Sequence, residues 1–153
     1  MNRDVGRAWV AALRSGEYEQ GRNYLRTRDL RTDRTYHCCL GVLCELARVE
    51  GVVVLDEDPG AVTVIGRYRP AGQGVDLGEV ATLPTVVAEW AGLESESPFV
   101  AGRELTVWND GGTEDDDGTP VRPHTFLEIA DLLEAKLHDV LTGDGETRET
   151  NDD

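Results

Sequence analysis

The chain has 153 residues and a formal net charge of −15, because 30 acidic residues outnumber 15 basic ones. So large a negative charge argues against direct binding to nucleic acid or to an anionic membrane surface. The length predicts a single globular domain over residues 1–142, and the composition predicts a disordered acidic tail over residues 143–153.

The first third of the chain predicts two helices separated by a polar segment. Apolar residues recur at helical spacing from Asp4 to Ser15, which favours a first amphipathic helix. Residues 17–35 are polar and lack a clean period, so we expect a loop with a short extended piece at 23–26. The most apolar run of the chain, at residues 36–47, predicts a buried helix of about three turns.

The middle of the chain predicts a β-hairpin followed by a short helix. Residues 52–55 and 61–68 are rich in β-branched side chains and flank the turn sequence DEDPG. Pro84 suits the first turn of a helix that ends before Gly92. Residues 105–108 are apolar and predict a short strand or the lead into a turn.

The last third combines an acidic loop with a final helix. Residues 109–118 (NDGGTEDDDG) predict a solvated loop that opens with a turn at Asn109-Asp110. The sequence Thr125-Phe126-Leu127-Glu128 matches a capping box, which predicts that the last helix begins there. The predicted fold is α+β, with three or four helices packed on a small antiparallel β-hairpin or sheet.

The three cysteines lie in or beside the apolar run at residues 36–47. Their odd number and the adjacent pair Cys38-Cys39 favour reduced thiols in a cytoplasmic protein, and we find neither a signal peptide nor a membrane-spanning run. A thiol at a helix N-terminus can act as a nucleophile, so one alternative is a hydrolase with His124 as base and Asp110 as orienting group. The other interpretation is that both cysteines are core residues. We adopt the second and assign no catalytic residue.

A candidate ligand site combines arginines with aromatic side chains. Residues 21–24 offer a glycine, a guanidinium and an aromatic ring together, which suits a small anion. We expect such a ligand between residues 22–36 and the turn at residues 108–110, where Asp110 would pair with Arg22 or Arg26. The residues assigned to this site are Arg22, Tyr24, Arg26, Tyr36, Trp108, Asn109 and Asp110. Carboxylates interleave with these arginines, so local salt bridging on the surface is the simpler alternative.

Neither a metal nor a cofactor is expected. The cysteine spacing does not match a zinc site, and the acidic loop at 109–118 does not match the EF-hand pattern. Phosphate-binding and dinucleotide-binding glycine motifs are also missing from the sequence.

Several segments carry a family resemblance. WVAALRSG at residues 9–16, YxCCLGVLC at residues 36–44, Asn109-Asp110-Gly111 and FLEIAD at residues 126–131 resemble a family of small phage, prophage and bacterial proteins with YxCCLGVLC and LND.G..F..IAD motifs. The chain departs from that pattern at His37, at Trp108 and in an acidic insertion between Thr113 and Val121. The resemblance implies a phage or mobile-element context inside a bacterial host, and it implies no activity.

These observations lead to three hypotheses about function. The first is a non-catalytic, phage-type accessory protein that binds a small anionic, nucleotide-like ligand and sequesters a host defence signal. The second is an acidic inhibitor or DNA mimic that acts on a host protein, because residues 51–153 hold six basic and 23 acidic residues, a net of −17. The third is the cysteine-dependent hydrolase. The oligomeric state is left open, with a homodimer as one option.

Overall fold

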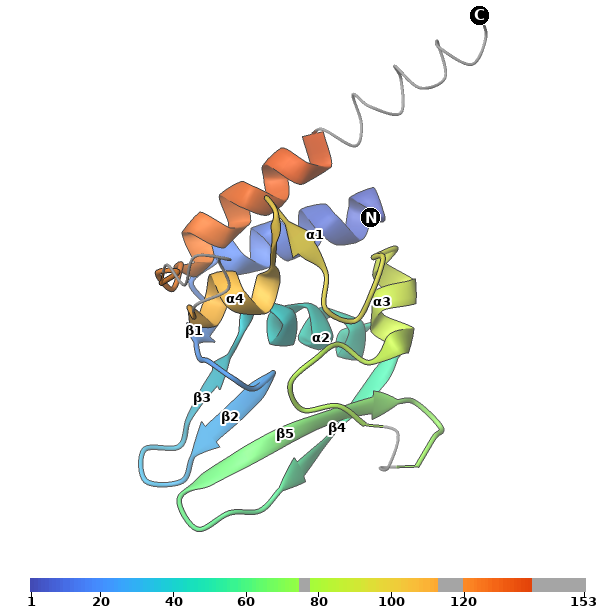
Figure 1. The fold of residues 1–153 in the computed structure, drawn as a ribbon. Coiled ribbons are helices and arrows are strands. Elements are labelled where there is room, and N and C mark those ends of the chain that lie inside the picture. The colour runs from blue at the N-terminus through green and yellow to red at the C-terminus, as the bar shows by residue number, and fades with distance from the viewer. Residues whose placement is uncertain (75–77, 113–119, 139–153) are drawn as a thin grey trace, which may run out of the picture.

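The computed structural model describes residues 1–74, 78–112 and 120–138, and these residues form an α+β fold, as predicted (Figure 1). They make five helices, a five-stranded sheet and a small hairpin. Most of the acidic loop at 109–118 and the whole acidic tail at 143–153 lie outside the described residues.

Helix α2 (Cys39–Val49) is the centre of the molecule, between the sheet on one side and the other helices on the other (Figure 1). Every residue from Cys39 to Glu45 is buried, so the helix is enclosed on all sides over its first two turns. Gly41 permits this close packing, because a Cβ atom at that position would lie 1.8 Å from the carbonyl oxygen of Leu25. The prediction of a buried helix in this stretch is confirmed.

Helix α1 (Arg3–Arg14) packs directly on α2. The side chain of Asn2 caps it by accepting hydrogen bonds from the amides of Asp4 and Val5 at 2.9 and 3.1 Å. The buried indole of Trp9 donates to the carbonyl oxygen of Cys39 at 2.9 Å. The indole N–H is one of the few polar groups on the apolar face of α1, and its hydrogen bond fixes α1 against the start of α2.

The main sheet has the strand order β1-β3-β2-β5-β4. Its strands are β1 (Glu19–Gln20), β2 (Arg26–Asp29), β3 (Arg34–His37), β4 (Val53–Asp58) and β5 (Thr63–Pro70). The β1–β3 pair is parallel and the other pairs are antiparallel, so the sheet is mixed. The β4–β5 hairpin confirms the prediction for this region, although β4 runs on through Asp58 and shortens the loop.

The prediction of a loop at residues 17–35 was wrong, because this segment supplies β1, β2 and the start of β3. Its charged side chains find partners across the sheet as well as along the chain, where Arg28 contacts Asp33 and Arg31 contacts Asp29. Arg26 and Arg28 both contact the carboxylate of Glu57 on β4, and Arg34 contacts Glu19 on β1. Tertiary pairing therefore overrides a local sequence that has little strand propensity.

The remaining elements close the other side of α2. Helix α3 (Thr85–Ala91) ends at Gly92 in the left-handed conformation, as predicted. The hairpin of β6 (Phe99–Val100) and β7 (Arg103–Glu104) leads into α4 (Leu105–Asp110). Residues 105–110 are thus helical, and the predictions of a strand at 105–108 and a turn at Asn109-Asp110 were wrong.

The last helix covers residues 126–138 in the described part of the chain. Its capping box is formed as predicted: the amide of Glu128 donates to Thr125 Oγ1 at 3.2 Å, and the amide of Thr125 donates to the Glu128 carboxylate at 3.0 Å. One continuous core joins this helix to α1, α2, α3 and α4, with contributions from residues as far apart as Trp9 and Leu137.

Candidate functional site

Asn109, assigned from the sequence to a ligand site, is instead the centre of a buried hydrogen-bond network. Its side chain is 0% exposed. Its Oδ1 accepts from the amide of Cys39 at 3.1 Å and from Gln20 Nε2 at 2.9 Å. Its Nδ2 donates to the carbonyl of Gly21 and to Asp110 Oδ1, each at 2.8 Å. Every hydrogen-bonding position of this amide is used inside the protein, so Asn109 has none to offer a ligand.

Gln20 extends this network to the last helix. Its Nε2 also donates to the carbonyl of His124 at 2.7 Å, and its Oε1 accepts from the amide of Phe126 at 3.1 Å. The two amide side chains therefore accept hydrogen bonds from backbone amides at the N-terminal ends of α2 and of the helix at 126–138, and they tie both helices to β1. Sequence reasoning missed the role of Gln20, because its partners Asn109, His124 and Phe126 are 89 to 106 residues away in the chain.

The expected ion pair between Asp110 and an arginine is replaced by other contacts. Asp110 Oδ1 accepts from the backbone amide of Asn23 at 3.2 Å, where Asn23 has a positive φ of 73°. Arg26 contacts Glu57 instead, at 2.8 Å. Asp110 thus stabilises a strained turn before β2 rather than one wall of an anion site.

Trp108 is also engaged inside the fold. Its indole nitrogen donates to the carbonyl of Val100 at 2.7 Å, and its ring meets the ring of His124 edge-on with centroids 4.7 Å apart. Arg103 covers the indole, with its guanidinium carbon 5.1 Å from the ring centroid. Of the other predicted ligand residues, Tyr24 is exposed, Arg22 lies at the surface, and Tyr36 is on β3. Asn109 and Asp110 contact the backbone of Gly21 and Asn23 on either side of Arg22, whereas the contacts of Trp108 within the described residues are with Val100, Arg103 and His124.

The thiols lie in an environment that disfavours a nucleophile. Cys38, Cys39 and Cys44 are all free and buried. Burial raises the pKa of Cys38 to about 12, and it raises the pKa of Cys39 and of Cys44 well above their usual value. His124 packs against Trp108, with its Nδ1 2.8 Å from the carbonyl of Arg122. The geometry gives no support to a thiolate at neutral pH.

A second buried polar cluster, which the sequence did not reveal, centres on His37 of β3. The imidazole is 6% exposed, and neither ring nitrogen has a hydrogen-bond partner among the residues that the structure describes. The ring of Tyr18 meets it edge-on at 5.3 Å. Burial lowers the pKa of His37 to about 4, because desolvation and the nearby charges of Arg26 and Arg48 outweigh the attraction of Glu45.

Glu45 anchors the same cluster from α2. It accepts two hydrogen bonds from Arg48, at 2.7 and 3.1 Å, and one from the hydroxyl of Tyr68 at 2.6 Å. Burial would raise its pKa, but these hydrogen bonds hold the pKa of the Glu45 carboxyl below its usual value. The cluster thus fastens α2 to β5 through a partly buried carboxylate whose partners are all supplied by the protein.

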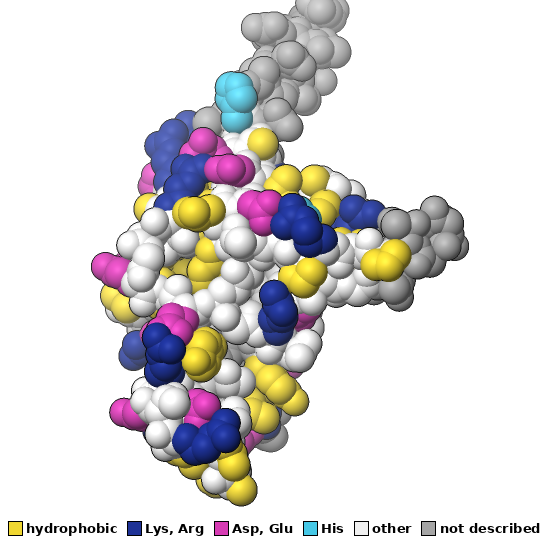
Figure 2. All heavy atoms as spheres, turned by 90° about the vertical axis from the view of Figure 1, so that its left-hand side faces the viewer, with side chains coloured by type: hydrophobic (Ala, Val, Ile, Leu, Met, Phe, Trp, Pro, Cys, Tyr) yellow, Lys and Arg dark blue, Asp and Glu magenta, His cyan; other side chains and the backbone are white. Residues whose placement is uncertain are grey.

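Elsewhere on the surface, arginines are mostly paired with carboxylates. Figure 2 shows blue and magenta side chains lying side by side over one face instead of forming separate patches. Ion pairs within the described residues, on whichever face they lie, include Arg67 with Asp58 at 2.7 Å, Arg69 with Asp56 at 2.6 Å and Arg122 with Glu128 at 2.8 Å. Surface ion pairing, the simpler alternative for the arginines of residues 22–34, therefore describes Arg28, Arg31 and Arg34, which each have a partner within residues 17–35. Arg26 is also paired, but with the distant Glu57 of β4.

Two open grooves lie on either side of α1 and differ in the charge of their rims. The first, of about 490 Å³, runs between α1 and the helix at 126–138, and we call it the basic-rimmed groove. It is lined by Arg7, Val10, Ala11, Arg14, Glu134, Leu137 and His138. The second, of about 360 Å³, runs between α1, α2 and α3, and we call it the acidic-rimmed groove. It is lined by Asn2, Asp4, Val5, Ala8, Leu46, Val49, Glu50 and Trp90.

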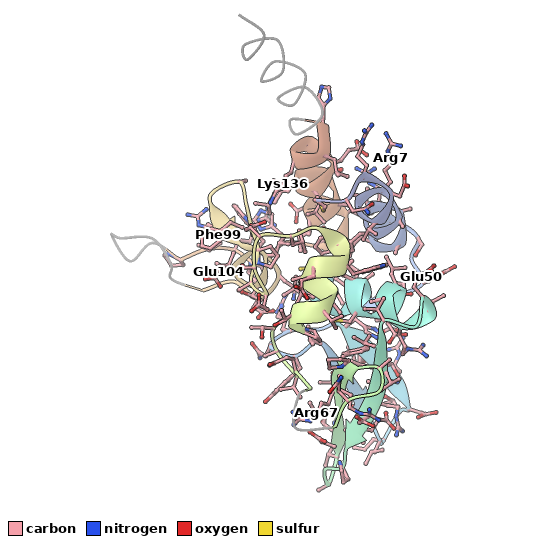
Figure 3. All side chains as sticks on the ribbon, turned by 90° about the vertical axis from the view of Figure 1, so that its right-hand side faces the viewer. Arg7, Glu50, Arg67, Phe99, Glu104 and Lys136 are labelled. Carbon is pink, nitrogen blue, oxygen red and sulfur yellow. The ribbon has the colours of Figure 1, made fainter. Side chains whose placement is uncertain are left out.

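Figure 3 shows this arrangement from the side. Arg7 projects from α1 near the helix at 126–138, and Glu50 lies at the end of α2 on the other side of α1. A third groove, of about 310 Å³, lies between the β6–β7 hairpin and the other side of the helix at 126–138, around Phe99 and Lys136. Sequence reasoning identified none of the three, because each is formed by elements that are distant in the sequence.

The family model that matches the chain, described as a domain of unknown function (DUF8296), covers residues 1–137. The chain belongs to this family. The match spans both sheets and all five helices of the described structure except for its last residue. No curated protein and no solved structure matches the chain.

Within residues 1–74, 78–112 and 120–138, the structure gathers no set of three His, Cys, Asp or Glu side chains that could hold a metal ion. In the same part of the chain, no helix has the length and apolar character needed to cross a membrane.

Proposed function

We propose that this DUF8296 protein is a non-catalytic binding protein for a small anion that carries an apolar or aromatic body, and that the basic-rimmed groove holds this ligand. The observation that carries the proposal is the composition of the groove. In a chain with a net charge of −15, a cavity of about 490 Å³ is bordered by Arg7, Arg14 and His138 over an apolar floor, and Glu134, which pairs with Arg14, is the carboxylate among its lining residues.

The size and lining of the groove suit such a ligand. Small-molecule sites usually measure about 300–1,000 Å³ and place a few polar groups over a mainly apolar surface. Val10, Ala11 and Leu137 supply the floor, which suits a ring or an alkyl group. A ligand with both an anionic group and a flat aromatic body, such as a nucleotide, matches the two kinds of surface together.

The two arginines have different tasks in this proposal. Arg14 is held in place by Asp131 at 2.7 Å and Glu134 at 2.6 Å, so its position is fixed before a ligand arrives. Arg7 is exposed and forms no ion pair within the described residues. A guanidinium without an internal partner can bind a phosphate or carboxylate through two parallel hydrogen bonds.

Binding also suits this protein better than catalysis by a thiol. The buried thiols have raised pKa values, and the amide of Asn109 is fully occupied. The family resemblance, with its phage or mobile-element context, then suggests the biological form of the activity: an accessory protein that sequesters a nucleotide-like defence signal of the bacterial host.

Calorimetric titration tests the proposal with three probes: a nucleoside monophosphate, the same nucleoside without phosphate, and inorganic phosphate. We expect the monophosphate to bind more tightly than either fragment, because it uses the rim and the floor together. Arg7→Gln should weaken that binding by about fivefold or more, the value of one charge-assisted contact at a partly exposed site. Arg3→Gln is the matched control, because Arg3 is exposed on the same helix but does not line the groove.

Two results would overturn the proposal. One is the absence of any heat or chemical-shift change with the monophosphate at millimolar concentration. The other is equal weakening by Arg7→Gln and Arg3→Gln, which would show that only the overall charge matters. Both arginines are exposed, so folded variants are expected, and circular dichroism checks this point.

A further inference from the structure

The acidic-rimmed groove on the other side of α1 combines apolar exposure with unpaired charge. Its floor includes Val49, whose residue surface is 77% exposed, and the partly buried side chains of Leu46 and Trp90. Val49 is the last residue of α2, whose first seven residues are all buried. Its exposed apolar side chain therefore contrasts with the buried start of the same helix. A valine there adds nothing to the core, but it adds apolar area to the groove.

The rim of this groove is formed by Asp4 and Glu50, together with the amide of Asn2. Asp4 and Glu50 are both exposed, and neither forms an ion pair within the described residues. Elsewhere on the described surface, carboxylates such as Glu57 and Asp58 are engaged by arginines. The rim therefore offers two carboxylates that are free to meet cations from outside.

We infer that the acidic-rimmed groove is a docking site for a basic segment of a partner protein, with an apolar side chain of that segment seated on Val49 and Trp90 and its lysines or arginines placed against Asp4 and Glu50. The argument for this occupant is charge complementarity. The local rim and the net charge of −15 have the same sign, so both attract a basic segment and steer it to the groove.

The other possible occupants fit less well. A second copy of this chain carries the same net charge of −15, so its approach to an acidic rim is opposed by repulsion over the whole molecule. Nucleic acid and anionic lipid are repelled for the same reason. This docking site is separate from the basic-rimmed groove and does not depend on the function proposed for that groove.

A short synthetic peptide of leucine and lysine, with the leucines at helical spacing, is the probe for this site. The control peptide has glutamate in place of every lysine. In NMR titrations of the full-length protein, we expect the basic peptide alone to bind, with the largest shifts at Ala8, Val49 and Trp90. Glu50→Lys should weaken that binding by about fivefold, whereas Glu17→Lys, which makes the same charge change at an exposed position outside the groove, should leave it within twofold, about the scatter expected for a distant surface charge.

Val49→Ser provides a second variant that tests the apolar half of the site without changing its charge, and its exposed position keeps the fold intact. It should reduce peptide binding without moving the thermal midpoint by more than about two degrees. The inference is overturned if both peptides bind equally, if neither binds, or if Glu17→Lys and Glu50→Lys act alike. It is also overturned if sedimentation shows a dimer that Val49→Ser dissociates, because the occupant would then be a second copy.

Discussion

Asn109 shows how one buried amide can organise segments that are far apart in the chain. Its side chain bonds to residues of β1, of the segment after β1 and of α2, while its own backbone belongs to α4. Gln20 then passes the connection to the helix at 126–138. A network of this kind stabilises a fold only when all of its members are satisfied, and the Asn109 amide meets that condition.

The first prediction is that Asn109→Leu destabilises the protein by about 3 kcal/mol, because the amide of Cys39 and the carbonyl of Gly21 lose their partner in a buried site. Asn109→Asp keeps the size of the side chain but removes its donors and adds a charge beside Asp110, so it should also destabilise. Urea denaturation measures both changes. Gln73→Ala, at an exposed amide, is the control and should stay within about 0.5 kcal/mol. A wild-type midpoint for Asn109→Leu would contradict the structural role.

His37 is a different case, because its buried polar atoms are not satisfied by the protein. In the folded protein its pKa is about 4, below the usual 6.5 of an unfolded chain. The folded state therefore resists protonation, whereas the unfolded state accepts a proton below pH 6.5. Stability associated with His37 is complete above pH 6.5 and is lost as the pH falls from 6.5 towards 4.

The second prediction follows from this titration. Between pH 6.5 and 4.5, the free energy of unfolding should fall with a limiting slope of about 1.4 kcal/mol per pH unit. Carboxylates with lowered pKa values, such as Glu57 and Glu128, act mainly below pH 4.5, so the upper window isolates the histidine. Urea midpoints of wild type and His37→Phe at several pH values measure the effect. The free energy of unfolding of His37→Phe should not change with pH in this window, whereas that of His138→Gln should keep the wild-type slope. A slope retained by His37→Phe would refute the assignment.

At the scale of elements, the sequence predicted the helices and strands that are specified by residues close together in the chain. Helices α1, α2 and α3 have apolar periodicity or caps within their own residues, and so does the helix that begins after Thr125. The β4–β5 hairpin has β-branched strands and a turn sequence between them. In each case the residues that specify the element are neighbours in the chain.

The elements that were missed depend on distant residues. Strands β2 and β3 consist largely of arginine and threonine, and β2 is held between β3 and β5 of the sheet. Helix α4 has only six residues, which is too short for a helical period to be read. The sequence predicted a turn and a ligand site at Asn109 and Asp110, but it could not reveal that their hydrogen-bond partners include Gln20, Gly21 and Asn23. Nor could it reveal either groove, since each needs helices from separate parts of the chain.

At the scale of the whole molecule, the net charge acts differently on the two grooves. A basic segment that approaches the acidic-rimmed groove is attracted both by the local rim and by the overall charge of −15. An anion that approaches the basic-rimmed groove is attracted mainly by Arg7, because Arg14 is already paired with Asp131 and Glu134, and it is repelled by the rest of the molecule. The two fields add in the first case and partly cancel in the second.

The third prediction is therefore a difference in salt response between the grooves. The Debye length shortens from about 14 Å to about 4 Å as NaCl rises from about 50 mM to about 500 mM, so salt screens the long-range field most strongly. Over this range we expect the leucine–lysine peptide to lose at least about tenfold in affinity, because two attractions weaken together. The nucleoside monophosphate should lose less than about threefold, because screening removes a repulsion along with an attraction. Titrations of both probes on one protein sample measure the two slopes. Equal salt dependences would show that the net charge of the molecule does not affect binding at the grooves. A steeper salt dependence for the anion would contradict the charges assigned to the two grooves.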